Sequence, residues 1–260
     1  MLITADNYTI HISSEFNKDG EFGNLFSSNN YGSIFVLADE HTQAFCYPII
    51  KNLLPPHQVL QIQSGESEKN IETCKYLWQC LTDFQAERKS LLINLGGGVI
   101  GDMGGFVAGT FKRGFDFVNI PTTLLSQVDA SVGGKLGIDF NGIKNLIGLF
   151  QQPKVVFICP QFLKTLPFNQ LRSGFSEVIK HGLIYDADYY HACKVLDIQQ
   201  HNQWETIIGS SVKIKNEVVQ KNSNQSIRFS LLNSIGSCDF DLVVSDQLIA
   251  EAIQYYYSLS

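Results

Sequence analysis

Charged and amide side chains gather in one stretch of the chain, residues 91–145, that is otherwise composed like a protein core. They stand among glycines and short apolar runs, and they are Arg113, Asp129, Lys135, Lys144 and Asn145. Lysine and arginine bind phosphate groups through charge-assisted hydrogen bonds. This stretch therefore predicts a site for a small anionic ligand.

Three adjacent glycines, Gly96 to Gly98, stand in this stretch between a predicted strand and a predicted helix. Leu91–Leu95 has the length and composition of a buried strand, and a helical pattern covers residues 99–111. Such an arrangement brings backbone N–H groups and a helix N-terminus to a phosphate. An ordinary turn of an α/β protein would use the same residues, so the glycines alone leave both interpretations open.

The overall composition is that of a globular protein without a nucleic-acid or membrane partner. The chain has 260 residues and a net charge of −6, which gives no reason to expect a polyanionic partner. No apolar run has the length of a transmembrane helix, and the first residues do not resemble a signal peptide. The six cysteines are scattered, which indicates reduced, mostly buried thiols in a cytoplasmic protein.

Predicted strands and helices alternate through the first half of the chain. This pattern predicts an α/β fold with a doubly wound parallel sheet over residues 1–155, followed by a mainly α-helical domain over residues 156–260. Ligands bind such sheets at the carboxyl ends of the strands, where Asp39, Glu66 and Lys69 would lie beside the glycine turn. The predicted strands are Tyr8–Ser13, Gly32–Leu37, His57–Ile62, Leu91–Leu95, Phe117–Ile120 and Val155–Ile158, and the predicted helices of this half include Thr42–Leu54 and Asn70–Phe84.

Asp39 has two interpretations that the sequence leaves open. An acidic residue at the end of a parallel strand often holds a ribose hydroxyl. The same residue is also a good N-cap for the helix that follows it.

Two predicted helices of the second half carry charged side chains among mostly apolar residues. In Leu171–Ile184, the residues Glu177, Lys180 and His181 share one face, either as an ordinary ion pair or as half of a metal site. Trp204–Val219 carries Lys215 on a mostly apolar stripe, where a lysine usually extends its ammonium group to water.

Several motifs of the chain resemble the 3-dehydroquinate synthase family, which belongs to the sugar-phosphate cyclases of the dehydroquinate synthase and glycerol dehydrogenase superfamily. The similarity covers residues 30–233, and weaker agreement comes from GESEK at 65–69. The motifs that carry it are GGGVIGD at 96–102, FKRG at 111–114, PTTLLSQVDASVGGK at 121–135, GIKNLIGLFQQPK at 142–154 and SGFSEVIKHGLI at 173–184.

The resemblance implies a carbon–oxygen lyase that uses NAD and a divalent metal, zinc or cobalt. Its substrate would be 3-deoxy-D-arabino-heptulosonate 7-phosphate, converted to 3-dehydroquinate with loss of phosphate in the shikimate pathway of aromatic amino acid biosynthesis. Two alternatives stay open: another sugar-phosphate cyclase or polyol dehydrogenase of the superfamily, and a non-catalytic NAD-binding remnant.

The resemblance also implies roles for individual residues. Arg113 would reach the phosphate of a neighbouring subunit's substrate, which implies a homodimer, and Glu177 would be a metal ligand. The implied NAD-binding residues are Asp39, Glu66, Lys69, Gly97, Gly98, Val99, Asp102, Thr122, Thr123, Leu125, Asp129, Lys135 and Lys144. The implied catalytic residues are Arg113, Asp129, Lys135, Lys144, Asn145, Lys180, Lys215 and Asn233.

The family pattern ends near residue 233. The family carries histidine ligands in a motif L-N-x-G-H-[ST]-x-G-H-A, whereas this chain continues from Leu231-Leu232-Asn233 without a histidine. The chain is also shorter than is usual in the family, and we hypothesise a disturbed reading frame, with truncation or a degenerate paralogue as alternatives. A catalytic zinc usually has three protein ligands, so we expect impaired metal binding and little synthase activity.

Overall fold

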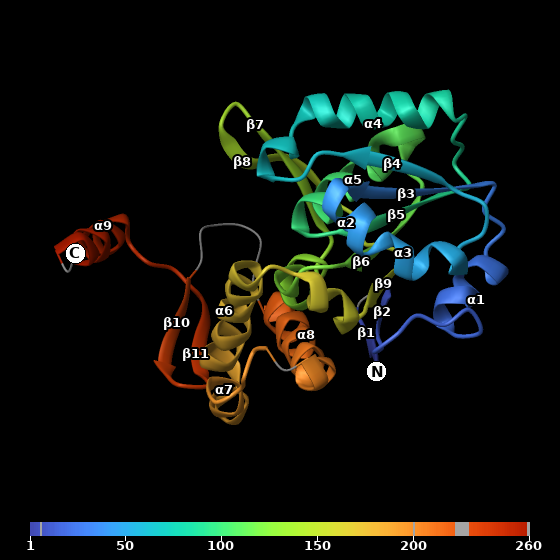
Figure 1. Ribbon diagram of the computed structural model, residues 1–260. Helices are drawn as coiled ribbons and strands as arrows, with labels where there is room; N and C mark the ends of the chain where they lie inside the picture. The colour runs from blue at the N-terminus through green and yellow to red at the C-terminus, as the bar shows by residue number, and fades with distance from the viewer. Residues whose placement is uncertain (6, 200, 222–228, 259–260) are drawn as a thin grey trace.

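A seven-stranded sheet forms the centre of the chain (Figure 1). The computed structural model describes residues 1–5, 7–199, 201–221 and 229–258. Only β1 and β2 pair in antiparallel fashion, and the other pairs of the sheet are parallel, which confirms the doubly wound prediction. The strand order is β1 (Leu2–Thr4), β2 (Thr9–Ile12), β9 (Val155–Ile158), β6 (Asp116–Pro121), β5 (Ser90–Gly96), β3 (Ser33–Asp39) and β4 (Gln58–Ile62).

Helices cover both faces of the sheet because its strands are apolar on both sides. On β3, Phe35 and Leu37 pack into a core with residues of α4 (Ile71–Asp83) and α5 (Gly98–Thr110). Ile34 and Val36 point the other way, into a core with residues of α1 (Glu21–Ser28) and α3 (Tyr47–Ile50). Figure 1 shows α4 and α1 on opposite sides of these strands.

The predicted helix Thr42–Leu54 is wrong as a single element. The structure divides it into α2 (Glu40–Phe45), α3 and a 3₁₀ turn, η1 (Lys51–Leu53). Pro48 occupies the first turn of α3, where its missing N–H and fixed φ start a helix rather than continue one. The remaining single turns are η2 (Glu66–Glu68), η3 (Phe111–Arg113), the π-helical η4 (Ser126–Ala130), η5 (Pro160–Thr165) and η6 (His201–Gln203).

A hairpin of β7 (Lys135–Phe140) and β8 (Ile143–Phe150) lies outside the main sheet, and the sequence patterns did not predict it. Leu136 and Ile138 of β7 are buried in the core that includes α5. On β8 the side chains of Ile143 and Phe150 are exposed. A strand with so little burial carries no clear alternation of apolar and polar residues, so the sequence pattern does not indicate this hairpin.

The second half packs three helices onto one end of the sheet: α6 (Phe168–Tyr185), α7 (Ala187–Lys194) and α8 (Trp204–Lys221). Trp204 is fully buried in a core that also contains Ile10 of β2 and Val156 of β9. This helical half therefore shares a core with the sheet, and the division at residue 155 stays a prediction.

Two more strands follow Val155–Ile158, in the half of the chain that the sequence predicts to be mainly α-helical. A further hairpin, β10 (Phe229–Ser234) with β11 (Ser237–Leu242), lies beside α6, and α9 (Asp246–Ser258) extends away from the sheet (Figure 1). Gly236 has a φ of 81° in the two-residue connection, which is the turn chemistry that a tight hairpin requires. None of the helices in the described ranges is long and apolar enough to cross a membrane.

Candidate functional site

A cavity of about 620 Å³ lies where β3, β5 and β6 end. Ligands of doubly wound sheets bind at this edge. The predicted cofactor residues that line it are Asp39, Glu66, Lys69, Gly97, Gly98, Val99, Asp102, Thr122, Thr123 and Leu125. We call this the cofactor cavity; the other three residues implied for NAD, Asp129, Lys135 and Lys144, are not among those that line it.

At the glycine turn, the cofactor cavity is lined by backbone atoms of Gly97 and Gly98, which have no side chains. Gly97 is the N-cap of α5, and no side chain caps the helix. A Cβ atom at Gly97 would lie 3.1 Å from Cγ2 of Thr123, so glycine keeps this space free. An uncapped helix N-terminus presents N–H groups and a partial positive charge, which fit a pyrophosphate.

Asp39 ends β3 as the N-cap of α2. Its Oδ1 accepts a hydrogen bond of 2.7 Å from the backbone N–H of Thr42, and the Asp39 backbone N–H donates to Oγ1 of Thr42 at 2.9 Å, which completes a capping box. The capping interpretation is thus confirmed. Because Asp39 also lines the cofactor cavity, the ribose interpretation stays open beside it.

A second cavity, of about 520 Å³, lies between η4, α8 and the β7–β8 hairpin. We call it the substrate cavity. Five candidate residues line it: Asp102, Asp129, Lys135, Asn145 and Lys215. Asp102 belongs to both cavities, so the two adjoin.

Lys69 joins the two cavities from a buried position. Its side chain is 5% exposed, and its Nζ lies 2.6 Å from both Oδ2 of Asp102 and Oδ1 of Asn145. Burial raises the pKa of the Asp102 carboxyl, and the Lys69 ammonium opposes that shift. A buried lysine needs such partners, and here they belong to different segments of the site.

An irregularity in the β7–β8 hairpin positions Asn145 in the site. Its pairing shifts register between Ile138 and Phe140, and Asn145 has a φ of 54°, a conformation that asparagine tolerates better than most residues. Asp139 fixes the segment: its Oδ1 accepts from the Asn145 N–H at 2.8 Å, and its own N–H donates to the Lys69 carbonyl at 2.8 Å.

A carboxylate–histidine cluster adjoins the substrate cavity. It consists of Asp129 on η4 and of Glu177 and His181 on α6, and one donor atom of each lies within 4.8 Å of the others. Lys180 and Lys215 form ion pairs with Glu177 and Asp129, respectively. Although burial opposes it, hydrogen bonding from His181 and Lys180 lowers the pKa of Glu177 to about 2.

Five predicted site residues line neither cavity, and two of them, Glu177 and Lys180, form an ion pair in or beside the carboxylate–histidine cluster. Arg113 is exposed in η3, and both it and Lys112 have left-handed backbone conformations, with φ of 71° and 49°. Lys144 is exposed, with its Nζ 3.1 Å from Oε1 of Glu66 at the rim of the cofactor cavity. Asn233 is exposed on β10. Lys180 reaches the site through Glu177 alone.

Sequence patterns missed two parts of the site. Leu166, Pro167 and Gln170, at the start of α6, line the cofactor cavity without any motif to mark them. The proximity of Asp129 to His181 depends on how η4 and α6 pack, which spacing along the chain does not encode. The π-helical turn at Asp129 is a geometry often found at functional sites, but it has no sequence signature.

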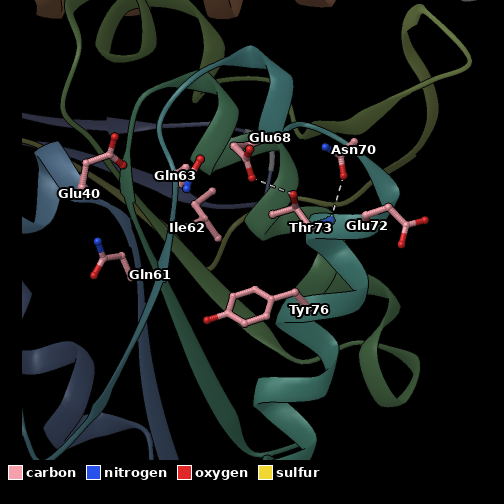
Figure 2. A pocket seen from close by; sticks show the side chains of 9 residues that line it. All are labelled: Glu40, Gln61, Ile62, Gln63, Glu68, Asn70, Glu72, Thr73 and Tyr76. Atoms are coloured by element: carbon pink, nitrogen blue, oxygen red, sulfur yellow. Dashed lines mark hydrogen bonds between the residues drawn. The ribbon is translucent and has the colours of Figure 1, made fainter.

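A further cavity, of about 960 Å³, lies elsewhere, beside the edge strand β4 (Figure 2). Glu40, Glu68 and Glu72 line it, and none of its described lining residues is basic. This charge disfavours an anionic ligand, so size alone does not identify the site.

Comparison with known families gives one consistent match. The family model described as "3-dehydroquinate synthase N-terminal" matches residues 59–173, and the one described as "3-dehydroquinate synthase C-terminal" matches residues 174–234.

Two curated relatives are both named 3-dehydroquinate synthase. The protein of Parabacteroides distasonis is 42% identical over 217 residues, which are 81% of this chain and 61% of the relative. The protein of Acetivibrio thermocellus is 37% identical over 87% of this chain and 65% of the relative. The chain thus spans less than two thirds of the length of these relatives.

Solved structures agree in fold. The 2-epi-5-epi-valiolone synthase ValA of Streptomyces hygroscopicus, solved with NAD⁺ and Zn²⁺ bound, has a TM-score of 0.73 and 24% identity over 84% of this chain and 63% of that chain. A 2-deoxy-scyllo-inosose synthase, solved with carbaglucose-6-phosphate, NAD⁺ and Co²⁺, has a TM-score of 0.72 and 22% identity over 84% of this chain and 63% of that chain. With the family models covering most of the chain, and relatives of this identity, the chain belongs to the 3-dehydroquinate synthase family.

Proposed function

We propose that this chain binds NAD in the cofactor cavity and a sugar phosphate in the substrate cavity, as a 3-dehydroquinate synthase-type protein. The observation that carries the proposal is the adjacency of the two cavities, which share Asp102 and are joined by Lys69. The substrate we infer is 3-deoxy-D-arabino-heptulosonate 7-phosphate, with 3-dehydroquinate and phosphate as products.

In the cofactor cavity, backbone and short polar side chains would hold the dinucleotide. The α5 N-terminus at Gly97 and Gly98 would bind the pyrophosphate, and Asp39 would accept a ribose hydroxyl. Thr122 and Thr123 border the same space with hydroxyl groups. Bound there, NAD supplies reversible hydride transfer at a substrate hydroxyl.

In the substrate cavity, cationic groups would hold the anion. The exposed Lys135 and the ammonium of Lys215 border it, and both suit a phosphate. Asn145 is fixed by Lys69 and Asp139, so its amide would orient a substrate hydroxyl without moving. The carboxylate of Asp129, at the same wall, would accept a hydroxyl hydrogen.

The residues of the carboxylate–histidine cluster fit a divalent metal. Carboxylate and imidazole groups are both zinc ligands, and Nε2 of the buried His181 lies 3.3 Å from Oε1 of Glu177. Zinc or cobalt held there would polarise a substrate oxygen as a Lewis acid. We propose Glu177 as the ligand that this chain shares with the family.

Turnover should nevertheless be low. The family match ends at residue 234, and Asn233 lies outside both cavities. The test is release of phosphate from the heptulosonate phosphate with NAD and added zinc or cobalt, with an intact homologue assayed beside it. We expect a rate far below that of the homologue, and a comparable rate would refute this expectation. Assaying other heptulose phosphates, and polyols for NAD reduction, tests the related cyclases and dehydrogenases.

A non-catalytic NAD-binding protein is the second candidate. It is favoured by the placement of the implied cofactor residues, most of which line a cavity of their own, whereas Asn233 lies outside both cavities. Calorimetric titrations with NAD and with metal, each alone, would separate the two: NAD binding without any metal binding supports the second candidate.

The assembly we propose is a homodimer in the cytoplasm. Arg113 is exposed and lines neither cavity of its own chain, so it is available to a neighbouring subunit's substrate. The six free cysteines fit a reducing compartment. Sedimentation of the purified chain tests the dimer, and a monomer at all concentrations would exclude it.

A further inference from the structure

The carboxylate–histidine cluster has the composition of a three-ligand metal site that differs from the family pattern. That pattern takes one glutamate and two histidines, and no histidine follows His201 in this chain. Here Glu177 instead meets Asp129 and His181. The side chains of Asp129, Glu177 and His181 are 26%, 15% and 2% exposed, so all three are largely shielded from water.

The spacing of two donors suits a tetrahedral ion. Nε2 of His181 lies 3.3 Å from Oε1 of Glu177. A tetrahedral zinc with ligand bonds of about 2.0–2.1 Å holds neighbouring donors about 3.3 Å apart. The pair therefore needs little movement to chelate one ion.

The third donor, the carboxylate of Asp129, lies near the other two because α6 packs closely against the chain at Gly174. A Cβ atom at Gly174 of α6 would lie 2.5 Å from the backbone nitrogen of Leu125, immediately before η4. Glycine thus allows α6 to approach the backbone that leads to Asp129. The contact brings the carboxylate of η4 to the face of α6 that carries Glu177 and His181.

In the structure, both carboxylates of the cluster form ion pairs with lysine ammonium groups. Lys180 contacts Glu177, and Lys215 contacts Asp129. An ammonium and a metal cation are attracted to the same oxygen atoms and repel each other. Metal binding must therefore displace or repel both lysines, which lowers the affinity of the site without removing a ligand.

We propose that Asp129, Glu177 and His181 form a divalent-metal site in this chain, and that Lys180 and Lys215 are its internal competitors. The proposal rests on the proposed function only for the choice of Zn²⁺ and Co²⁺ as probes. Its consequence is a site of moderate affinity, set by competition rather than by missing ligands.

The test titrates the full chain, freed of metal by a chelator, with Co²⁺ alone and with Zn²⁺ alone, without NAD or substrate. Calorimetry measures the affinity, and the visible d–d bands of Co²⁺ report coordination independently of activity. We expect one saturable site. Asp129→Asn and His181→Gln should each weaken it by at least about tenfold, as loss of a ligand exceeds the effect of losing a supporting contact.

Two further variants address packing and competition. Gly174→Ala retains all three ligand residues but forces α6 away from η4, so the affinity for the metal should fall. The neighbouring Ser173→Ala should leave the metal affinity unchanged. Lys215→Met should raise affinity by about tenfold, because a repelling charge is removed. The exposed residues Asp188 and His191 on α7 provide matched controls as Asp188→Asn and His191→Ala. Circular dichroism checks that each variant is folded.

Absence of saturable binding by the unaltered chain would overturn the proposal. Unchanged affinity in folded Asp129→Asn or His181→Gln would overturn the ligand assignment, and unchanged or weaker affinity in Lys215→Met would overturn the competition. These titrations contain no NAD, so they do not test the proposed function. That function fails in a separate experiment, if NAD does not bind to the chain.

Discussion

The two cavities of the site are built from different kinds of structure. The cofactor cavity takes its shape from strand ends, the turn at Gly97 and the capped start of α2 at Asp39. The substrate cavity and the adjoining cluster depend on side chains from η4, α6, α8 and the β7–β8 hairpin, which meet only after folding. The comparison indicates that the cofactor cavity is formed mainly by the ends of strands in one sheet, whereas the substrate side depends on how helices and a hairpin pack together.

The largest effect should come from filling the glycine turn. Gly97→Val would place a branched side chain where a Cβ is already 3.1 Å from Thr123. A valine side chain there would also obstruct the approach of a pyrophosphate to the α5 N-terminus, so NAD affinity should fall by at least about tenfold in calorimetry. Gly101→Val is the matched control, since a Cβ at Gly101 meets no atom within 4 Å. Equal NAD affinity in both variants would mean that the dinucleotide does not approach this turn.

Removing the connecting lysine should destabilise the fold. Lys69→Met leaves the Asp102 carboxylate without its cation, and a charge pair broken in a buried position costs about 3–5 kcal/mol. Because Asp102 is 21% exposed, we expect about 2 kcal/mol in urea denaturation. Lys144→Met, at an exposed pair with Glu66, should cost less than about 1 kcal/mol. Equal losses in both variants would contradict the buried role of Lys69.

The loss of stability in Lys69→Met should depend on pH, because Lys69 pairs with the Asp102 carboxylate. Burial raises the folded-state pKa of Asp102 above its ordinary value of 3.8, so its contribution to stability is greatest below pH 3.8 and decreases as pH rises through the folded-state pKa. Lys69→Met should raise this pKa further. The stability difference between the variant and the unaltered chain should therefore be small near pH 4 and grow toward about pH 7. A difference that stays constant across this range would exclude Asp102 as its cause.

The smallest effect should come from the cap of α2. Asp39→Ala removes the hydrogen bond to the Thr42 N–H and should cost about 1 kcal/mol of unfolding free energy. Asp39→Asn keeps the cap and loses the charge, so it should retain most of that stability. If NAD affinity falls in both variants, the carboxylate also serves the cofactor; if NAD affinity is unchanged in both, Asp39 is a cap alone.

The same difference explains how far the sequence predicts the structure. The parallel sheet and the glycine-turn wall of the cofactor cavity follow from contiguous motifs, because strand, glycine turn and helix are neighbours in the chain. The β7–β8 hairpin could not be predicted, since the exposed β8 carries no alternation around Ile143. The meeting of Asp129 with His181 could not be predicted either, because it depends on the close approach of α6 at Gly174.

Calorimetric titration of the full chain with NAD, with and without a chelator, tests the central claim most directly. If the cofactor cavity does not depend on the metal cluster, NAD binds to one site with equal affinity in both conditions, and His181→Gln binds it equally well. Failure to bind NAD, or loss of binding when metal is removed, would contradict this account.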